Sequence, residues 1–504
     1  MRITICFLVA TLAGCEHDLL PEIPDAPPPM EIHGTATEHD ITDNGVVDRA
    51  GDLSGTAFVS ITPTKSGFED HVGTGSTDGT FVVPVGFGAS TWDLGLTQHD
   101  VYGAGLGNIS STAQTFLVGS STSPDLSRSH LGRGDASPPM STTTVTANVT
   151  GLNTWQLTDD LEIMSSNAGA FVFSPQAGFA TPLAAGATTT AQSFAWPTTV
   201  PLVDSDKGDA TVLFQLVTQA PGTGIQYRAL AKLGTATQFT ETDGAPAVMN
   251  VALADIPRTE TLTVHFKHDE FEAFLPQIGA GAMASAENVF IDALPDAVTR
   301  GFFGSAPDLV TCFRPGSTDL DISFSYANPF ATMGTAWDEW VIAYEAFTVP
   351  VLAPGATTPF NLMVYAYTDL PVAGFPSDGN ITPQVTPVRN IKIGGMDLGT
   401  PRTGVGLTPT VTWDAPTTGT VTSYLVSIYK IVADGTVTDA QILANFVTTS
   451  GSLSIPDMIL TSLGSSYLLV ITAYADPGAD FTVAPFLNRL PDAYTTVVTA
   501  QFTP

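Results

Sequence analysis

Apolar and polar residues alternate with a period of two along much of this chain, and this pattern constrains the fold more than any other feature. Residues 225–233, 262–266 and 320–326 each place apolar side chains at every second position. Successive side chains of an extended strand point to opposite faces, so each segment predicts a β-strand with one buried face. The 46 glycines and 37 prolines predict frequent turns. We therefore expect an all-β protein of several tandem antiparallel β-sandwich domains.

Residues 281–300 depart from the alternation and are the best helical candidate in the chain. Pro295 interrupts this segment, because proline cannot donate the backbone hydrogen bond that a helix interior requires. The sequence predicts a short crossover helix here.

The charge balance excludes one class of partner. The chain has 49 Asp and Glu against 17 Lys and Arg, which gives a net charge of −32 at pH 7. Such a surface repels phosphate backbones, so we expect no nucleic-acid binding. Only 13% of the residues are charged, which separates the chain from disordered acidic tails.

The N-terminus has the layout of an export signal. Arg2 precedes an apolar stretch that is too short to span a bilayer, and small residues follow. The stretch ends in Leu12-Ala13-Gly14-Cys15, which resembles the lipobox of bacterial lipoproteins. The resemblance implies that residues 1–14 are a signal peptide and that Cys15 is lipidated. It also implies a place in the cell envelope, at the outer membrane or cell surface of a Gram-negative bacterium. The alternative is an ordinary cleaved signal followed by a chance cysteine.

The rest of the chain divides into five parts behind a tether. Residues 15–30 are rich in proline and acid and favour extended conformations. We expect a first domain at 31–118, a linker at 119–140, β-rich domains at 141–257 and 258–386, and a last domain at 387–504. One large two-sheet domain at 141–386 is the alternative.

The first domain contains a hairpin signal, Thr77-Asp78-Gly79-Thr80-Phe81, between two strand-like runs. An Asp-Gly pair favours a tight turn because such turns need positive φ. The order of these runs resembles the carboxypeptidase regulatory-like (transthyretin-like) β-sandwich family, although the hairpin is one residue shorter than usual. The resemblance implies a structural module and no catalytic residue.

The last domain resembles fibronectin type III, an immunoglobulin-like sandwich. The segments 411–416, 423–429 and 467–474 look like its second, third and sixth strands. The resemblance implies that Trp413 is the core tryptophan and that Tyr467 forms the tyrosine corner. The proline that usually precedes this corner is absent.

The cysteines leave no internal disulfide. Cys6 lies in the signal and Cys15 is the lipid site, so only Cys312 remains as a thiol. It lies in an apolar strand-like run, where we expect a buried and inert side chain.

Histidines belong to two candidate sets of metal ligands. His265 and His268 are three positions apart on an expected strand and would point to opposite faces, so we interpret 265–270 as a charged strand end. A second set lies in the first domain, mostly in expected loops. These residues could converge on zinc or copper, but solvated loop positions are favoured: His33, Glu38, His39, Asp40, His71 and His99.

Two short motifs have simpler interpretations. Residues 204–209 resemble part of a calcium loop, but the segment contains a lysine and lacks the following acidic ligand, which indicates a polar turn. Residues 133–135 form the Arg-Gly-Asp tripeptide that some adhesion receptors read, and a match of this length in a linker arises by chance.

The sequence contains no G-x-S-x-G elbow, no phosphate-binding glycine loop and no Cys–His pair in a catalytic motif. We therefore expect no catalytic residue, no cofactor and no metal. The expected function is a non-enzymatic, lipid-anchored envelope protein whose β-sandwich modules serve binding, adhesion or scaffolding, with a protein or glycan as ligand. One alternative is carbohydrate capture through Trp337, Trp340, Tyr365 and Tyr367. The other is an envelope hydrolase with a site in 141–386.

Overall fold

The structure is a computed structural model, and it describes residues 30–65, 67–97, 113–220, 225–236, 238–295, 306–314, 316, 318–332, 337–461, 463–487, 490 and 492–504. The protein is mostly β and has several sheets and only short helices, so the prediction of a β-rich fold is confirmed. Cys15, with the signal and the tether up to residue 29, lies outside the described residues, as does His99. No helix within the described ranges is long and apolar enough to cross a membrane.

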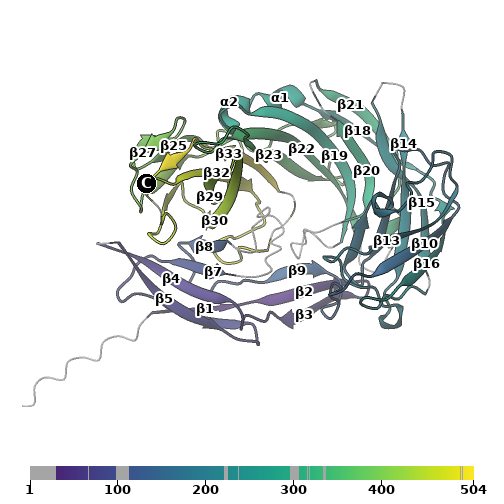
Figure 1. Cartoon of the computed structure of the whole chain (residues 1–504), viewed down its shortest axis with the longest axis horizontal. Coiled ribbons are helices and arrows are strands. Elements are labelled where there is room, and N and C mark those ends of the chain that lie inside the picture. Colours follow the sequence, from purple (N-terminus) through teal and green to yellow (C-terminus); the bar gives the residue numbers. More distant parts are fainter. Residues whose placement is uncertain are drawn as a thin grey trace, which may run out of the picture.

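One large sheet contains 21 of the strands that the structure describes and curves around the molecule in Figure 1. Most of its strands form an unbroken hydrogen-bonded run, whose spatial order is β12 (Ala170–Phe173), β11 (Asp160–Ser165), β14 (Thr211–Gln219), β15 (Tyr227–Ala236), β20 (Asp308–Arg314), β19 (Met283–Pro295), β22 (Trp337–Val351), β23 (Phe360–Pro371), β33 (Ala493–Val498), β32 (Ser466–Ala475), β29 (Ser423–Asp434), β30 (Val437–Thr448), β8 (Gln114–Val118), β7 (Asp93–Thr97), β4 (Ala57–Thr64), β5 (Gly67–Gly75), β6 (Thr80–Pro84) and β1 (Glu31–Thr35). Three short strands attach to this run: β17 (Ala254–Asp255), β27 (Arg402–Thr403) and β34 (Phe502–Thr503).

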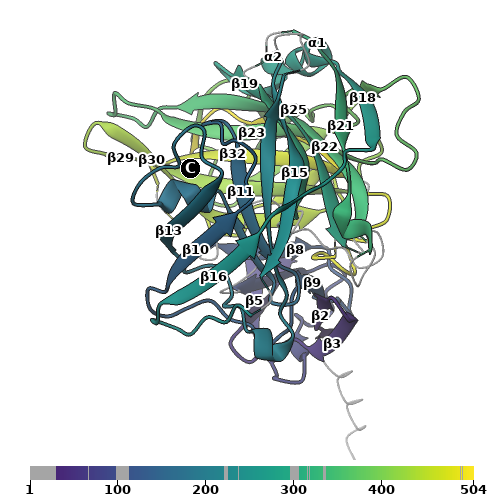
Figure 2. The ribbon, with the colours of Figure 1, turned by 90° about the vertical axis from the view of Figure 1, so that its right-hand side faces the viewer.

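Four smaller sheets accompany the large one. Figure 2 views the side on which β10, β13 and β16 lie together. The members of the small sheets are β10 (Thr144–Thr150), β13 (Thr189–Ala195) and β16 (Ala247–Ala252); β18 (Glu260–Phe266), β21 (Leu320–Tyr326) and β24 (Asn380–Ile381); β2 (Thr37–Thr42), β3 (Gly45–Ala50) and β9 (Arg128–Leu131); and β25 (Arg389–Ile393), β26 (Met396–Asp397), β28 (Thr410–Asp414) and β31 (Ser452–Ser454). The short helices are α1 (His268–Glu272) and α2 (Leu275–Ile278), with 3-10 turns η1 (Pro175–Gly178), η2 (Ser205–Lys207) and η3 (Pro329–Thr332).

Segments from the two ends of the chain share one sheet. Strand β8 pairs in parallel with β30, and Phe116 lies opposite Phe446. Their rings stack with centroids 4.8 Å apart, and both side chains are fully buried. Strand β15 likewise pairs with β20, which joins residues 141–257 to residues 258–386 within the same sheet. Hydrogen bonds and apolar packing therefore link parts of the sequence that lie hundreds of residues apart.

Apolar side chains fill the space between the layers. The largest cluster lies where β18, β21 and the helices cover β19, β20, β22 and β23, and Val264, Phe324, Val289 and Phe347 belong to it. A second cluster lies between the sheet of β25 and β28 and the strands β29, β30 and β32. Burial on this scale is the main stabilising contribution to such folds.

The predicted helix at 281–300 is wrong, because residues 283–295 form strand β19. This strand pairs with β22 from Met283 to Pro295 and with β20 from Glu287 to Asp292. Its side chains alternate between faces, with Val289, Ile291 and Ala293 in the core. Tertiary pairing on both sides therefore outweighs the local pattern that favoured a helix.

The strands expected from alternation are confirmed. The alternating segments 225–233, 262–266 and 320–326 correspond to β15, β18 and β21. Strands β18 and β21 pair so that Val264 lies opposite Ile322. The Asp-Gly hairpin is also confirmed, because β5 pairs with β6 and Gly79 has φ of +81°. A Cβ at Gly79 would lie 2.4 Å from the carbonyl oxygen of Ala36, so this turn requires glycine.

Two side chains that the fibronectin resemblance singled out are buried in the core of the last segment. Trp413 packs edge-on against Tyr424. Tyr467 is fully buried and stacks against Phe502. Its hydroxyl has no hydrogen-bond partner, so the bond that defines a tyrosine corner is not formed.

Candidate functional site

Three neighbouring strands place charged side chains in one row on the core face of the large sheet. Glu287 on β19 lies opposite Arg314 on β20 and opposite Glu345 on β22. Glu287 shares its face with Val289 and Ile291, which belong to the largest apolar cluster. Both carboxylates are completely buried. Charged groups in such a place are costly unless they find partners.

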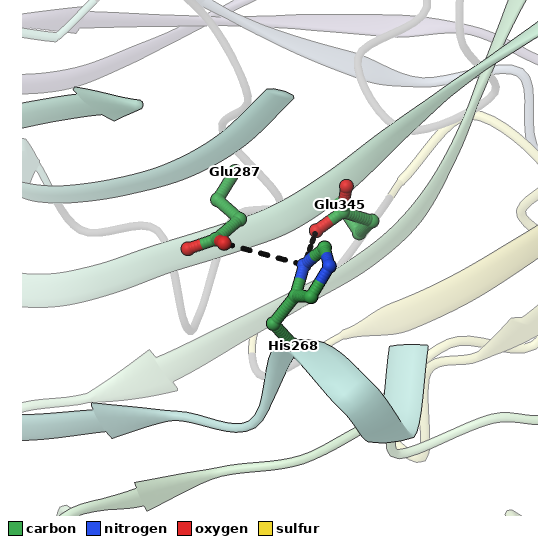
Figure 3. Close-up of side chains that lie close together, drawn as sticks. All are labelled: His268, Glu287 and Glu345. Carbon is green, nitrogen blue, oxygen red and sulfur yellow. Dashed lines mark hydrogen bonds and ion pairs between the residues drawn. The ribbon is translucent and has the colours of Figure 1, made fainter. Parts of the chain in front are cut away.

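His268 reaches this row from the layer of β18 and α1, which packs against the core face of the large sheet. It is the first residue of helix α1, directly after strand β18, and its side chain is 0% exposed. Its Nδ1 lies 3.2 Å from Oε1 of Glu287 and 3.1 Å from Oε2 of Glu345 (Figure 3). The imidazole nitrogen and the two carboxylates thus converge on one point, with ligand atoms all within 4.8 Å of one another.

Further contacts hold the cluster in place. The guanidinium of Arg314 donates to both oxygens of Glu287 at 2.8 Å. Gly316 leaves room for this carboxylate, because a Cβ there would lie 1.8 Å from Glu287 Oε1. The Nε2 of His268 has no hydrogen-bond partner and faces Glu272 Oε2 at 3.7 Å. Oε1 of Glu345 is also buried without a partner.

Burial dominates the electrostatics of this cluster. It raises the pKa of Glu345 to about 9, and the charges of Glu287 and Glu272 act in the same direction. Burial also raises the pKa of Glu287, although Arg314 and His268 oppose the shift. With a pKa of about 9, the carboxyl of Glu345 holds a proton at neutral pH. The cluster can therefore either hold a proton or exchange it for a metal cation.

A second buried set of carboxyls crosses several strands of the large sheet. Asp308 hydrogen-bonds both Glu162 and Asp292, while Asp369 hydrogen-bonds Asp492. Asp292 and Asp369 influence each other electrostatically, which links the two groups. On β19, Asp292 points away from the face that carries Glu287. We call these five residues the carboxyl row.

The carboxyl row has little compensating positive charge. Burial raises the pKa of Asp308 to about 6 and that of Asp492 to about 7; the charge of Asp476 adds to the rise for Asp492, and the hydrogen bond with Asp369 opposes it. Arg228 opposes the rise at Asp308, and it forms an ion pair with Asp160 at 2.7 Å. Oxygens of four members lack hydrogen-bond partners: Glu162 Oε2, Asp292 Oδ1, Asp369 Oδ1 and Asp492 Oδ1. The row is therefore held together by shared protons at neutral or lower pH.

The candidate metal ligands of residues 31–118 do not converge on one site among the described residues. The expectation that this set lies mostly in loops is wrong, because five of its members are strand residues on β1, β2 and β5. Each has a separate partner within ion-pair distance: His33 with Glu31, Glu38 with Arg128 and His130, His39 with Asp48, Asp40 with Arg49, and His71 with Glu69.

The two loop motifs also form local contacts. The turn at 204–209 is confirmed, since η2 lies there and Asp204 accepts a hydrogen bond from the backbone of Asp206. Arg133 forms an ion pair with Asp209 at 2.9 Å, and Lys207 forms one with Asp135 at 2.6 Å. Arg133 also pairs with Asp135, so the charges of the Arg-Gly-Asp tripeptide are engaged within the chain.

The aromatic side chains considered for carbohydrate capture lie mostly in the interior. Trp337 and Trp340 are each 2% exposed and Tyr367 is 7% exposed, while Tyr365 is half-buried. The burial expected for Cys312 is confirmed, and it raises the pKa of the thiol to about 11. A thiol of this kind is a poor nucleophile.

A groove of about 500 Å³ lies between α2, β25 and the end of β33. Its lining includes Gln277, Arg389 and Asn390. Arg389 donates to the carbonyl of Ala415, and Asn390 donates to Asp414. These two polar side chains are therefore bound to their own neighbours.

Comparisons with known proteins give no family. No protein-family model matches the sequence, and no curated protein matches it. Among solved structures, the chain is similar to a tetra-tandem repeat from the extending region of a large adhesion protein, at 12% identity over 92% of this chain and 98% of that chain, with a TM-score of 0.13. It is also similar to a mutant Salmonella alpha-2-macroglobulin, at 9% identity over 90% of this chain and 28% of that chain, with a TM-score of 0.10. Scores this low carry no argument about fold or function.

Sequence reasoning singled out His268 but missed its partners. The interpretation of 265–270 as a charged strand end is wrong for His268, which is fully buried at the start of α1. Glu287 and Glu345 lie 19 and 77 residues further along the chain. These two residues could have been found from the sequence as carboxylates at inward-facing positions of alternating strands. Glu287 was missed because residues 281–300 were predicted to be a helix.

Proposed function

We propose that this chain is a non-enzymatic lipoprotein of the cell envelope, anchored through Cys15, whose β-sandwich modules serve binding, adhesion or scaffolding. The lipobox-like sequence Leu12-Ala13-Gly14-Cys15 carries this proposal. A diacylated cysteine supplies enough buried hydrocarbon for stable attachment to a membrane.

The described fold supports a scaffolding role. Two-layer packing recurs along the chain, and the last segment places β25, β28 and β31 against β29, β30 and β32 around a shared core. We propose that this segment is a fibronectin type III-like module and that residues 31–118 form a carboxypeptidase regulatory-like module. The pairing of β8 with β30 joins the two, so that binding surfaces on either would keep a fixed geometry.

Replacement of Cys15 tests the anchor. We expect Cys15→Ala to abolish labelling by a fatty-acid precursor and to move the protein from the membrane fraction to the soluble fraction. Cys312→Ala is the matched control, because it removes the buried thiol and should leave labelling and fractionation unchanged. Intact mass spectrometry of the native protein is the second measurement. A chain that keeps residues 1–14 and has no acyl mass would contradict the proposal.

The binding role needs a separate measurement. We expect the purified chain to be retained on immobilised envelope proteins or glycans without altering them. Turnover of a glycan or ester substrate by the wild-type chain would instead support the hydrolase alternative.

A further inference from the structure

We propose that His268, Glu287 and Glu345 bind one divalent transition-metal ion of the zinc class, which fastens helix α1 to the large sheet. Lipidation of Cys15 has no bearing on this site, so the site and the envelope function stand or fall separately. The ligand set combines one imidazole nitrogen with carboxylate oxygens, which suits zinc and its neighbours better than calcium or magnesium.

The distances from the imidazole nitrogen to the two carboxylates fit such an ion. Ligand atoms around a tetrahedral zinc ion with bonds of about 2.0 Å lie about 3.3 Å apart. Nδ1 of His268 lies 3.2 Å from Glu287 Oε1 and 3.1 Å from Glu345 Oε2. Glu345 Oε1 is buried without a partner and offers a fourth donor if this carboxylate binds through both oxygens.

The surrounding groups match the outer shell of a metal site. A histidine that binds a metal through one ring nitrogen usually donates the other N–H to a carboxylate. Glu272 Oε2 faces His268 Nε2 at 3.7 Å, in position for this role after a small side-chain movement. Arg314 holds both oxygens of Glu287 and thereby fixes the orientation of this ligand.

The location gives the ion a structural role. His268 comes from the layer of β18 and α1, whereas Glu287 and Glu345 come from adjacent strands of the large sheet. All three side chains are 0% exposed, so the ion would enter while the chain folds and would leave slowly afterwards.

Metal content of the isolated protein tests the site. The full chain is produced in zinc-supplemented medium, purified without chelators and analysed by inductively coupled plasma mass spectrometry. We expect about one zinc ion per wild-type chain and less than about a tenth of that in Glu345→Gln, which keeps the shape of the side chain. Folding of each variant is checked by circular dichroism, and Glu287→Gln provides a second variant with the same expectation.

The matched control is His265→Gln. His265 forms a similar pair with Asp321 at 2.6 Å on β18 and β21, but Asp321 is exposed and no third ligand joins them among the described residues. We expect this variant to keep about one zinc ion. A folded wild-type chain with less than about a tenth of an equivalent of any divalent transition metal overturns the site, and so does equal metal content in wild type and Glu345→Gln.

Discussion

Phe116→Ala should destabilise the protein by about 3–5 kcal/mol. It should also weaken the pairing of β8, in residues 31–118, with β30, in residues 387–504. The ring of Phe116 is fully buried, and it stacks on Phe446 where β8 pairs with β30. Its removal leaves a cavity in the core that covers this pair of strands, which come from distant parts of the chain. We expect amide hydrogen exchange to accelerate in β8 and β30 together, and the melting temperature to fall.

A double-mutant cycle separates this pairing from general loss of core packing. Phe116→Ala and Phe446→Ala remove the same contact, so the double variant should lose less stability than the sum of the single variants, by about 0.5–3 kcal/mol. Phe239→Ala is the control, because its ring is equally buried but lies in a separate apolar cluster. Its effect should add to that of Phe446→Ala. Additive effects for Phe116 and Phe446 would show that the two rings do not stabilise each other.

The local parts of this fold were predictable because their signals are local. Alternation in 262–266 and 320–326 determines which faces are buried, and the structure pairs these two strands with their apolar faces together. The turn at Gly79 follows from its need for positive φ. Neither inference requires knowledge of distant parts of the chain.

The pairing of strands from distant segments was not predictable in the same way. Nothing in the sequence of β8 specifies β30 as its neighbour, because backbone hydrogen bonds are the same for every apolar strand. The same reason explains the error at β19, where two flanking strands convert an ambiguous segment into a buried strand. His268 was visible as a ligand type, but its partners became neighbours only through those pairings.

The carboxyl row is the second feature with a large expected effect, and it makes stability depend on pH. An unfolded aspartate has a pKa of about 3.9, whereas burial raises the pKa of Asp492 to about 7 and that of Asp308 to about 6. The folded chain therefore keeps protons that the unfolded chain releases. Stability from these groups is complete below about pH 4, falls as the pH rises above that value, and is lost once the pH has passed about 6 to 7. We expect a higher melting temperature at pH 5 than at pH 8.

Asp492→Asn isolates this contribution, because the amide has the shape of the carboxyl but cannot ionise. Relative to wild type, the variant should gain on the order of 4 kcal/mol at pH 8, equivalent to about 4 °C in a chain of this size, but only about 1–2 kcal/mol at pH 5. Asp457→Asn replaces an exposed aspartate and should shift the melting temperature equally at both pH values. Parallel pH profiles for wild type and Asp492→Asn would contradict the argument, because the buried carboxyl would then titrate alike in the folded and unfolded chains. A difference that grows from pH 5 to pH 8 would mean that the interior of the sheet tolerates these acids only while they share protons.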